Sequence, residues 1–303
     1  MKYTIAISAY KGKFIQECIN SILKQSYTDF ELIILNDESP DNIENIVSEY
    51  NDPRIRYYKN DKNVGALNLV DNWNKCLSLA RGDYYMQMGD DDILDIRYLE
   101  TFNELINKYP NLGVYHCRSL IIDENSQPYD ITSPLPEKES IYSYIYYRLK
   151  NRVQFISDFV YNTKLLRSNN GFYKLPLAWG SDDITSYIAA SLNGIAHTNE
   201  TVFLYRSNRY SITSTGNTTI KIEAVIHIIQ WIKDYIKKDN NYNETAKLFK
   251  PLICKQLNKY QEEQITHLLY LTLKQNKIKS LYLTVKKYKI NIKLLLKAII
   301  RFF

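Results

Sequence analysis

The sequence predicts an α/β protein in which helices flank a mostly parallel sheet. Apolar runs of strand length at 3–10, 30–35 and 55–58 alternate with segments of helical periodicity, the pattern of consecutive βαβ units. An apolar share of 45% over 303 residues is sufficient for a buried core, so a disordered chain is excluded. From about residue 219 the strand patterns stop and only helical ones follow.

Strands and helices alternate strictly in the first part of the chain. In the segment 14–24, Ile15, Cys18, Ile19 and Ile22 recur at the spacing of one helical face. The other elements predicted here are a helix at 42–50, a turn at 60–65, a helix at 66–80 and a strand that ends at Met88.

The second part of the chain is less regular. Residues 123–150 are rich in Pro and Tyr, which predicts a loop followed by a helix. The other predicted elements are a helix from about Leu99, strands within 111–122, a helix from Asp182, a strand at 201–206, and helices from 219, at 246–273 and at 292–303.

Charge divides the chain into two regions. Residues 220–303 contain 17 Lys/Arg against 6 Asp/Glu, whereas residues 1–219 carry a net charge of −5. We therefore expect a front domain at 1–219 and a helical, basic C-terminal region at 220–303 that faces an anionic surface. Four cysteines without paired spacing predict reduced thiols in a cytoplasmic protein and exclude a zinc site. The sequence predicts neither a signal peptide nor a membrane-spanning helix.

The last predicted helix is amphipathic. Lys293, Lys297 and Arg301 lie four residues apart on one face and leave another face apolar. This pattern predicts a helix that binds the surface of an anionic membrane without crossing it. The alternative is a dimerisation or docking helix with a solvated basic face. Nucleic acid is not expected as a partner, because the basic residues follow no recognition motif.

Three successive carboxylates, Asp90, Asp91 and Asp92, follow the strand that ends at Met88. Adjacent carboxylates repel one another and raise each other's pKa, so a chain that keeps three together usually compensates them with a cation. The alternative is helix capping, for which Asp92 or Asp95 would suffice.

Other polar residues end the neighbouring strands. Tyr10 and Asp37 follow the first two strands as Asp91 follows the fourth. Ligands bind beyond the carboxyl ends of parallel strands, so we expect these residues to meet in one cleft.

Six motifs in fixed order resemble the family 2 glycosyltransferases, which have the GT-A fold. They span about 95 residues and are Ile7-Ser8-Ala9-Tyr10, Ser21-Ile22-Leu23-Lys24-Gln25-Ser26-Tyr27, Leu35-Asn36-Asp37-Glu38-Ser39, Asn63-Val64-Gly65, Leu79-Ala80-Arg81-Gly82-Asp83-Tyr84 and the acidic turn.

The resemblance implies a nucleotide-sugar donor that lies across the sheet beside Ser8, Ala9 and Tyr10, with the Tyr10 ring next to the base. Asp37 matches the aspartate that hydrogen-bonds uracil, which points to a UDP-sugar. For Gly65 the family match implies close approach of the backbone to the donor, and a plain turn glycine is the alternative. For Asp37 the alternative is an N-cap of the helix at 42–50.

The acidic turn departs from the family pattern at one position. Asp91 matches the second aspartate of the DxD motif, which holds Mn²⁺ or Mg²⁺ against the diphosphate. Gly89 stands where the first aspartate is usual. Asp90 and Asp92 flank the site, and Asp90 is the expected substitute. Carboxylate oxygens suit these hard cations.

Further residues take roles that the resemblance implies. In Asp182-Asp183 the second acid matches the general base that deprotonates the acceptor hydroxyl. The alternative is that both acids only favour the N-terminus of their helix.

The family's next motif is a loop that closes over the diphosphate. It is matched by Arg206 and Ser211, and Asn208 stands where a histidine is usual. Arg206 or Arg209 is expected to contact phosphate.

Together these observations predict an inverting, metal-dependent glycosyltransferase on the inner face of a bacterial cell membrane. The expected acceptor is a saccharide, and its expected form is a lipid-linked oligosaccharide of capsule or O-antigen type. The departures at Gly89 and Asn208 motivate an alternative, a catalytically silent partner subunit that binds nucleotide or glycan. No GxGxxG motif follows the first strand, which excludes a dinucleotide-dependent oxidoreductase.

Overall fold

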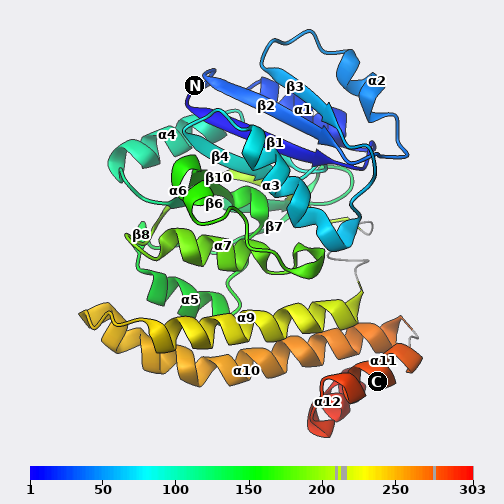
Figure 1. Cartoon of the computed structure of the whole chain (residues 1–303), viewed down its shortest axis with the longest axis vertical. Coiled ribbons are helices and arrows are strands. Elements are labelled where there is room, and N and C mark those ends of the chain that lie inside the picture. Colours follow the sequence, from blue (N-terminus) through cyan, green and yellow to red (C-terminus); the bar gives the residue numbers. More distant parts are fainter. Residues whose placement is uncertain (209–210, 213–216, 276–277, 303) are drawn as a thin grey trace.

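A computed structural model describes residues 1–208, 211–212, 217–275 and 278–302. Its first four strands are parallel neighbours in the order β3-β2-β1-β4 (Figure 1). This order confirms the predicted α/β class. The four strands are β1 (Tyr3–Ala9), β2 (Phe30–Asn36), β3 (Ile55–Lys59) and β4 (Tyr84–Met88).

Successive side chains of these strands enter two different cores, because strand residues alternate between the faces of a sheet. Ile5 and Ile7 pack in one buried cluster, while Ala6 packs in the other. The helices and the short 3₁₀ turn that connect the strands lie where the sequence predicts them. They are α1 (Ile15–Leu23), α2 (Ile43–Ser48), η1 (Ala66–Asn68) and α3 (Leu69–Leu79).

Both antiparallel and parallel pairs complete the sheet. β9 (Phe159–Asn162) lies between β4 and β6 (Val114–Ile122) and is antiparallel to both, and β10 (Ile195–Arg206) follows β6 in parallel. β10 begins earlier than predicted, because a polar stretch with register shifts interrupts its apolar pattern. Three short edge strands were not predicted, namely β5 (Ile93–Leu94), β7 (Pro128–Ile131) and β8 (Lys138–Glu139).

Four more helices lie within residues 1–208, and one of them, α5, follows the Pro- and Tyr-rich segment as predicted. α7 begins one residue before the predicted acidic pair. Their bounds are α4 (Tyr98–Lys108), α5 (Ile141–Leu149), α6 (Thr163–Ser168) and α7 (Ser181–Ala190), with short 3₁₀ turns η2 (Ile156–Asp158) and η3 (Pro176–Ala178).

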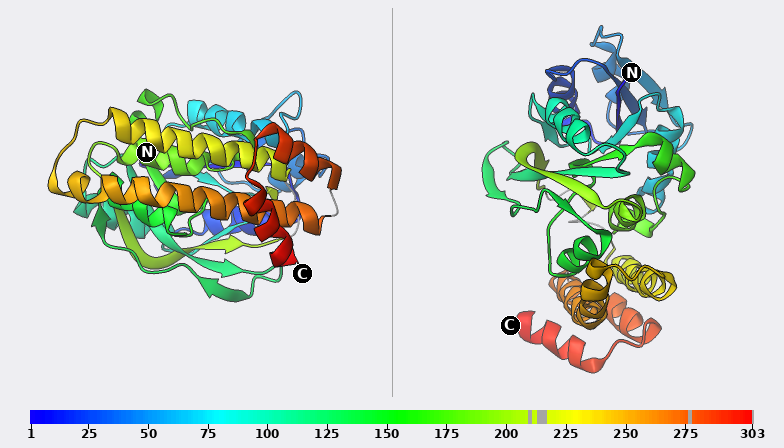
Figure 2. Two further views of the ribbon diagram at one scale, coloured as in Figure 1. Left: turned by 90° about the horizontal axis from the view of Figure 1, so that it is seen from below. Right: turned by 90° about the vertical axis from the view of Figure 1, so that its left-hand side faces the viewer.

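Two long C-terminal helices run side by side beneath α5 and α7 (Figures 1 and 2). They are α9 (Thr218–Lys238) and α10 (Glu244–Lys274), and α11 (Ile278–Lys287) and α12 (Ile292–Phe302) follow them. Ile228 of α9 belongs to the same buried cluster as the sheet residue Ala6. The helices therefore continue the core of the front part, and the boundary near 219 stays a prediction.

The terminal helix α12 has two apolar faces. Leu294 and Ala298 are buried against the rest of the molecule. Ile292, Leu296 and Ile300 are 67%, 53% and 76% exposed and follow one another at four-residue spacing. None of the helices in the described ranges is long and apolar enough to cross a membrane.

Candidate active site

The acidic turn lies against the loop that follows β1. Asp90 Oδ2 accepts hydrogen bonds from the backbone N–H groups of Tyr10 and Lys11, both at 2.8 Å. Burial and the neighbouring Asp91 charge raise the pKa of Asp90 to about 6, while the two N–H groups oppose that shift. Asp90 thus joins the loop after β1 to the turn after β4.

The side chain of Asp91 is held by the segment after β10. Its Oδ2 accepts a hydrogen bond from the Asn208 amide at 2.6 Å, and its backbone carbonyl accepts one from Arg206 Nε at 2.7 Å. Ser211 donates to the Asn208 carbonyl at 3.2 Å. The asparagine that replaces the expected histidine is therefore a direct partner of the predicted metal ligand.

Asp92 occupies the space beside Gly89. A Cβ added at Gly89 would lie 2.6 Å from Asp92 Oδ2, so a side chain there would collide with that carboxylate. Asp92 accepts hydrogen bonds from Arg206 N at 2.9 Å and Ser157 Oγ at 3.3 Å. Burial raises its pKa well above the usual range, and the Asp91 charge adds to this shift. Capping is not its role, because the N-cap of α4 is Arg97.

Arg206 is a structural residue in this arrangement. Its side chain is fully buried, with the guanidinium group 4.2 Å from the centre of the Phe14 ring. It donates to the carbonyls of Asp91 and Asp123 and forms an ion pair with Glu17 at 2.6 Å. Contact with a phosphate would require these bonds to break, so Arg206 is better assigned to holding the acidic turn. Arg209 lies outside the described residues.

Asp37 is buried and bound to the turn that follows β3. Its Oδ1 accepts hydrogen bonds from the Asn60 amide at 2.7 Å and from Val64 N at 3.0 Å. The Asn63 amide donates to Oδ2 at 3.1 Å. Asp37 is not a helix cap, because the N-cap of α2 is Asn42. These contacts fix the carboxylate in one orientation beside the end of β2.

Gly65 follows this turn with a φ of +76°, a conformation that L side chains rarely adopt. Tyr10 is 44% exposed, and its carbonyl accepts a hydrogen bond from Ser39 Oγ. Ala9 O accepts from Asp37 N at 2.9 Å, and Ser8 is half-buried beside Ala9. The predicted base-binding residues thus gather at the ends of β1 and β2.

The two acids that open α7 have different surroundings. Asp183 is buried, and its Oδ1 accepts hydrogen bonds from Arg148 Nε and the Gln154 amide, both at 2.7 Å. Within the described ranges no side chain donates to the Asp182 carboxylate. Burial and the Asp183 charge raise the pKa of Asp182 to about 7, and Arg148 opposes the shift.

One cavity of about 300 Å³ connects the two acidic groups. Asp92 lines it from the acidic turn, Asp182 and Asp183 from α7, and Trp179 from the loop before α7. Arg148 and Gln154 line it too, although sequence reasoning missed both. They lie in and after the Pro- and Tyr-rich segment, where no motif marks them.

The donor set suits a hard divalent cation. Within the described residues no three acidic, imidazole or thiol groups converge as a complete metal site. Mg²⁺-type ions, however, commonly take one or two protein carboxylates and complete their coordination with substrate phosphates and water. The Asp91 carboxylate beside Asp90 and Asp92 fits that requirement, because a cation would relieve the repulsion among the three.

Comparisons with known proteins agree with this architecture. The model of "Glycosyl transferase family 2" matches residues 4–166, more than half of the chain. Glycosyltransferase GlyG of Streptococcus pneumoniae is 31% identical over 99 residues, which cover 32% of each protein. The chain spans less than half the length of the curated relatives it matches.

Two solved structures have the same fold. S. aureus TarS 1-349 in complex with UDP-GlcNAc has a TM-score of 0.66 and 17% identity, and the alignment covers 89% of this chain and 81% of that one. Mannosyltransferase PcManGT from Pyrobaculum calidifontis, in complex with GDP-Man and Mn²⁺, has a TM-score of 0.56 and 14% identity over 99% and 86% of the two chains. These structures show the fold, and the family model that matches more than half of the chain shows the family. This chain belongs to glycosyl transferase family 2.

Proposed function

We propose that the protein is an inverting glycosyltransferase that uses a nucleoside-diphosphate sugar, most simply a UDP-sugar. The observation that carries this proposal is a cavity lined by both Asp92 of the acidic turn and the Asp182–Asp183 pair. A diphosphate leaving group and an acceptor hydroxyl need a cation site and a base on opposite sides of one anomeric carbon.

The donor would lie across the ends of β1 and β2. Asp37, fixed by Asn60 and Val64, would accept a hydrogen bond from a uracil N–H, and the exposed residue Tyr10 follows the neighbouring strand β1. Asp91 would hold Mn²⁺ or Mg²⁺, and such an ion neutralises charge that develops on the diphosphate. TarS binds UDP-GlcNAc and PcManGT binds GDP-Man and Mn²⁺, which supports this class of ligand.

The transfer step is an in-line displacement. The acceptor hydroxyl attacks the anomeric carbon, the bond to the diphosphate oxygen breaks, and the hydroxyl proton passes to the acidic pair. The sequence predicts Asp183 as the base, and this stays a prediction. The contacts favour the alternative that Asp183 is held by Arg148 and Gln154 while Asp182 receives the proton.

The acceptor would be a saccharide, and a lipid-linked oligosaccharide fits the C-terminal region. The exposed residues Ile292, Leu296 and Ile300 lie beside Lys293 and Lys297, a combination that suits the headgroup region of an anionic bilayer. We therefore propose that the protein binds the inner face of the cell membrane.

The ligand claim is tested by thermal unfolding with UDP, GDP, CDP and dTDP, each with and without Mn²⁺. Ligand at about 100 times its Kd adds ~2.7 kcal/mol, which raises Tm by several degrees. We expect one nucleotide to act, with a Mn²⁺ dependence that Asp91→Asn removes and the surface control Asp130→Asn keeps. No shift with any nucleotide would contradict the proposed donor class.

A further inference from the structure

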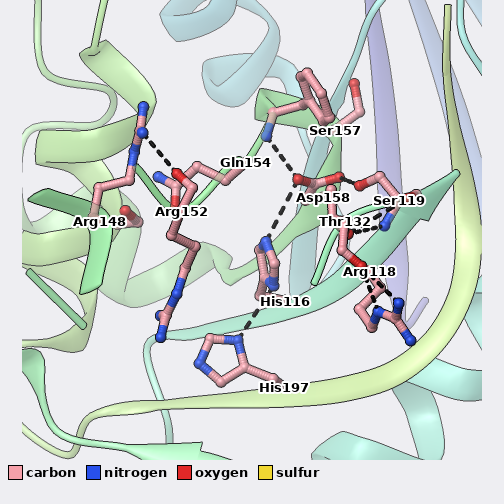
Figure 3. A network of polar contacts seen from close by, with 12 residues as sticks. His116, Arg118, Ser119, Thr132, Arg148, Arg152, Gln154, Ser157, Asp158 and His197 are labelled. Atoms are coloured by element: carbon pink, nitrogen blue, oxygen red, sulfur yellow. Dashed lines mark hydrogen bonds and ion pairs between the residues drawn. The ribbon is translucent and has the colours of Figure 1, made fainter. Parts of the chain in front are cut away.

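The side chains of Glu139, His197, His116 and Asp158 form a buried chain of ionisable groups, and Figure 3 shows the last three of them. Glu139 Oε1 lies 3.0 Å from His197 Nε2, and His197 Nδ1 lies 3.2 Å from His116 Nδ1. His116 Nε2 lies 3.5 Å from Asp158 Oδ2. All four side chains are at most 4% exposed, and the far end is closed by an ion pair between Glu139 and Arg152.

The hydrogen bonds along this chain need one more proton than two neutral imidazoles can supply. Three gaps separate the four groups, and each needs a hydrogen between its two heteroatoms. If Glu139 accepts from His197 and His197 accepts from His116, then neutral His116 turns a bare nitrogen toward Asp158. Among the described residues His116 Nε2 indeed has no hydrogen-bond partner, and a buried polar atom of this kind requires an explanation.

A proton on His116 resolves this conflict. It turns the contact with Asp158 into a buried ion pair, and Arg152 balances the charge of Glu139, so the network is neutral overall. The Asp158 carboxylate accepts hydrogen bonds from Phe155 N at 2.6 Å and from Ser119 Oγ, so it can face a charged His116 as an acceptor. Burial lowers the pKa of His197 to about 4, which agrees with one neutral and one charged imidazole.

The segment 152–158 that Asp158 holds touches both halves of the active site. At one end Ser157 Oγ donates to Asp92 Oδ2 at 3.3 Å and accepts from Gly89 N at 3.1 Å. Toward the other end the Gln154 amide donates to Asp183 at 2.7 Å. Asp158 closes the turn between these two contacts.

We propose that Asp158 and a protonated His116 are positioning residues of the transfer reaction. They fix the segment 152–158. Ser157 then holds Asp92 of the acidic turn, Gln154 holds Asp183 of the acidic pair, and the distance between the two groups stays constant. This inference rests on the proposed function, because it assigns those two groups to donor and acceptor. Neither residue touches the cavity that would hold the reacting atoms.

The protonation of His116 can be measured without any substrate. The chain has four histidines, so ¹⁵N-histidine labelling gives four rings, and His116→Gln assigns one of them. At pH 7.5 we expect both nitrogens of His116 to carry protons and only one nitrogen of His197 to do so. A neutral His116 ring would overturn the proposal.

The positioning role is tested by whether each substitution changes donor KM, kcat or both. Ser157→Ala should raise donor KM, Gln154→Met should lower kcat, and Asp158→Asn should do both by tenfold or more. Asp130→Asn on the exposed strand β7 is the control. If Asp158→Asn only lowers Tm, with KM and kcat within twofold of wild type, the role is structural and the proposal fails.

Two other outcomes are distinct. If Asp158→Asn does not fold, near-wild-type kinetics in both Ser157→Ala and Gln154→Met would overturn the proposal. If the wild type releases no nucleotide from any donor, the proposed function fails, whereas the His116 proton is still decided by the ¹⁵N spectrum.

Discussion

Arg148 and Asp183 form a partly buried ion pair in which Arg148 Nε lies 2.7 Å from Asp183 Oδ1. The pair sets the chemistry of its neighbour Asp182. An arginine that is already committed to Asp183 only partly offsets the repulsion that Asp182 experiences, so the pKa of Asp182 stays raised. A carboxylate that titrates near neutral pH is well matched to general base catalysis at that pH.

We expect Asp182→Asn to lower kcat by about 10²- to 10⁴-fold, the usual contribution of a positioned base. Wild-type activity should rise with pH through about 7 as Asp182 loses its proton, and the variant should lack that rise. Asp183→Asn should instead move the rise to lower pH, because it removes the charge that raises the pKa of Asp182. A rise that survives in Asp182→Asn and vanishes in Asp183→Asn would return the role of base to Asp183.

The same carboxyl group makes a prediction for stability. In the folded protein Asp182 keeps its proton up to about pH 7, whereas in the unfolded chain it ionises near its ordinary pKa. Between these values the folded state binds more protons, so the free energy of unfolding falls as pH rises. Asp182→Asn should therefore have the wild-type Tm at pH 4 and a higher Tm at pH 8. If the variant and the wild type had the same Tm at pH 4 and also at pH 8, ionisation of Asp182 would not destabilise the folded protein, contrary to this account.

Restoring the usual aspartate at position 89 should weaken the site. Even a Cβ there approaches Asp92 Oδ2 to 2.6 Å, so Gly89→Asp would displace Asp92 from Ser157 and Arg206 N. We expect a lower Tm and weaker Mn²⁺ binding in the presence of nucleotide, measured by calorimetry. Tighter Mn²⁺ binding in Gly89→Asp would show instead that Gly89 weakens the metal site of the wild-type protein.

The exposed stripe on α12 predicts how the protein meets a membrane. Leu296 and Ile300 are 53% and 76% exposed, so Leu296→Glu and Ile300→Glu should leave Tm nearly unchanged. Each should reduce cosedimentation with vesicles of anionic lipid, because apolar insertion is lost and negative charge is added. Unchanged binding would assign the stripe to a protein partner, and Glu200→Gln is a distant surface control.

The alternation of strands and helices up to Met88 was predictable, because each strand is a compact apolar run between turn residues. β7 and β8 were missed because they are short edge strands, which need no apolar pattern. All four residues of β7 are exposed. α11 was also missed, as its cations interrupt the apolar periodicity.

The candidate site likewise contains residues that the sequence indicates and residues that it does not. Asp37, Asp91 and Asp183 end or begin regular elements, so their types and positions could be read from the sequence. The partners that orient Asp183 could not, since Arg148 and Gln154 reach it from about 30 residues away without any motif. Arg206 shows the converse, because the sequence identifies a guanidinium group but not that it is buried against Glu17.

The central claim is that this protein turns over a nucleotide sugar and is not a silent partner subunit. The most direct test is the rate of nucleotide release from a panel of UDP-, GDP-, CDP- and dTDP-sugars with Mn²⁺, with and without a crude lipid-linked saccharide fraction. We predict release from one donor that the acceptor accelerates and that is lost in the Asp182→Asn/Asp183→Asn double variant but kept in Asp130→Asn. Nucleotide binding without release from any donor, or release that the double variant retains, would contradict the claim.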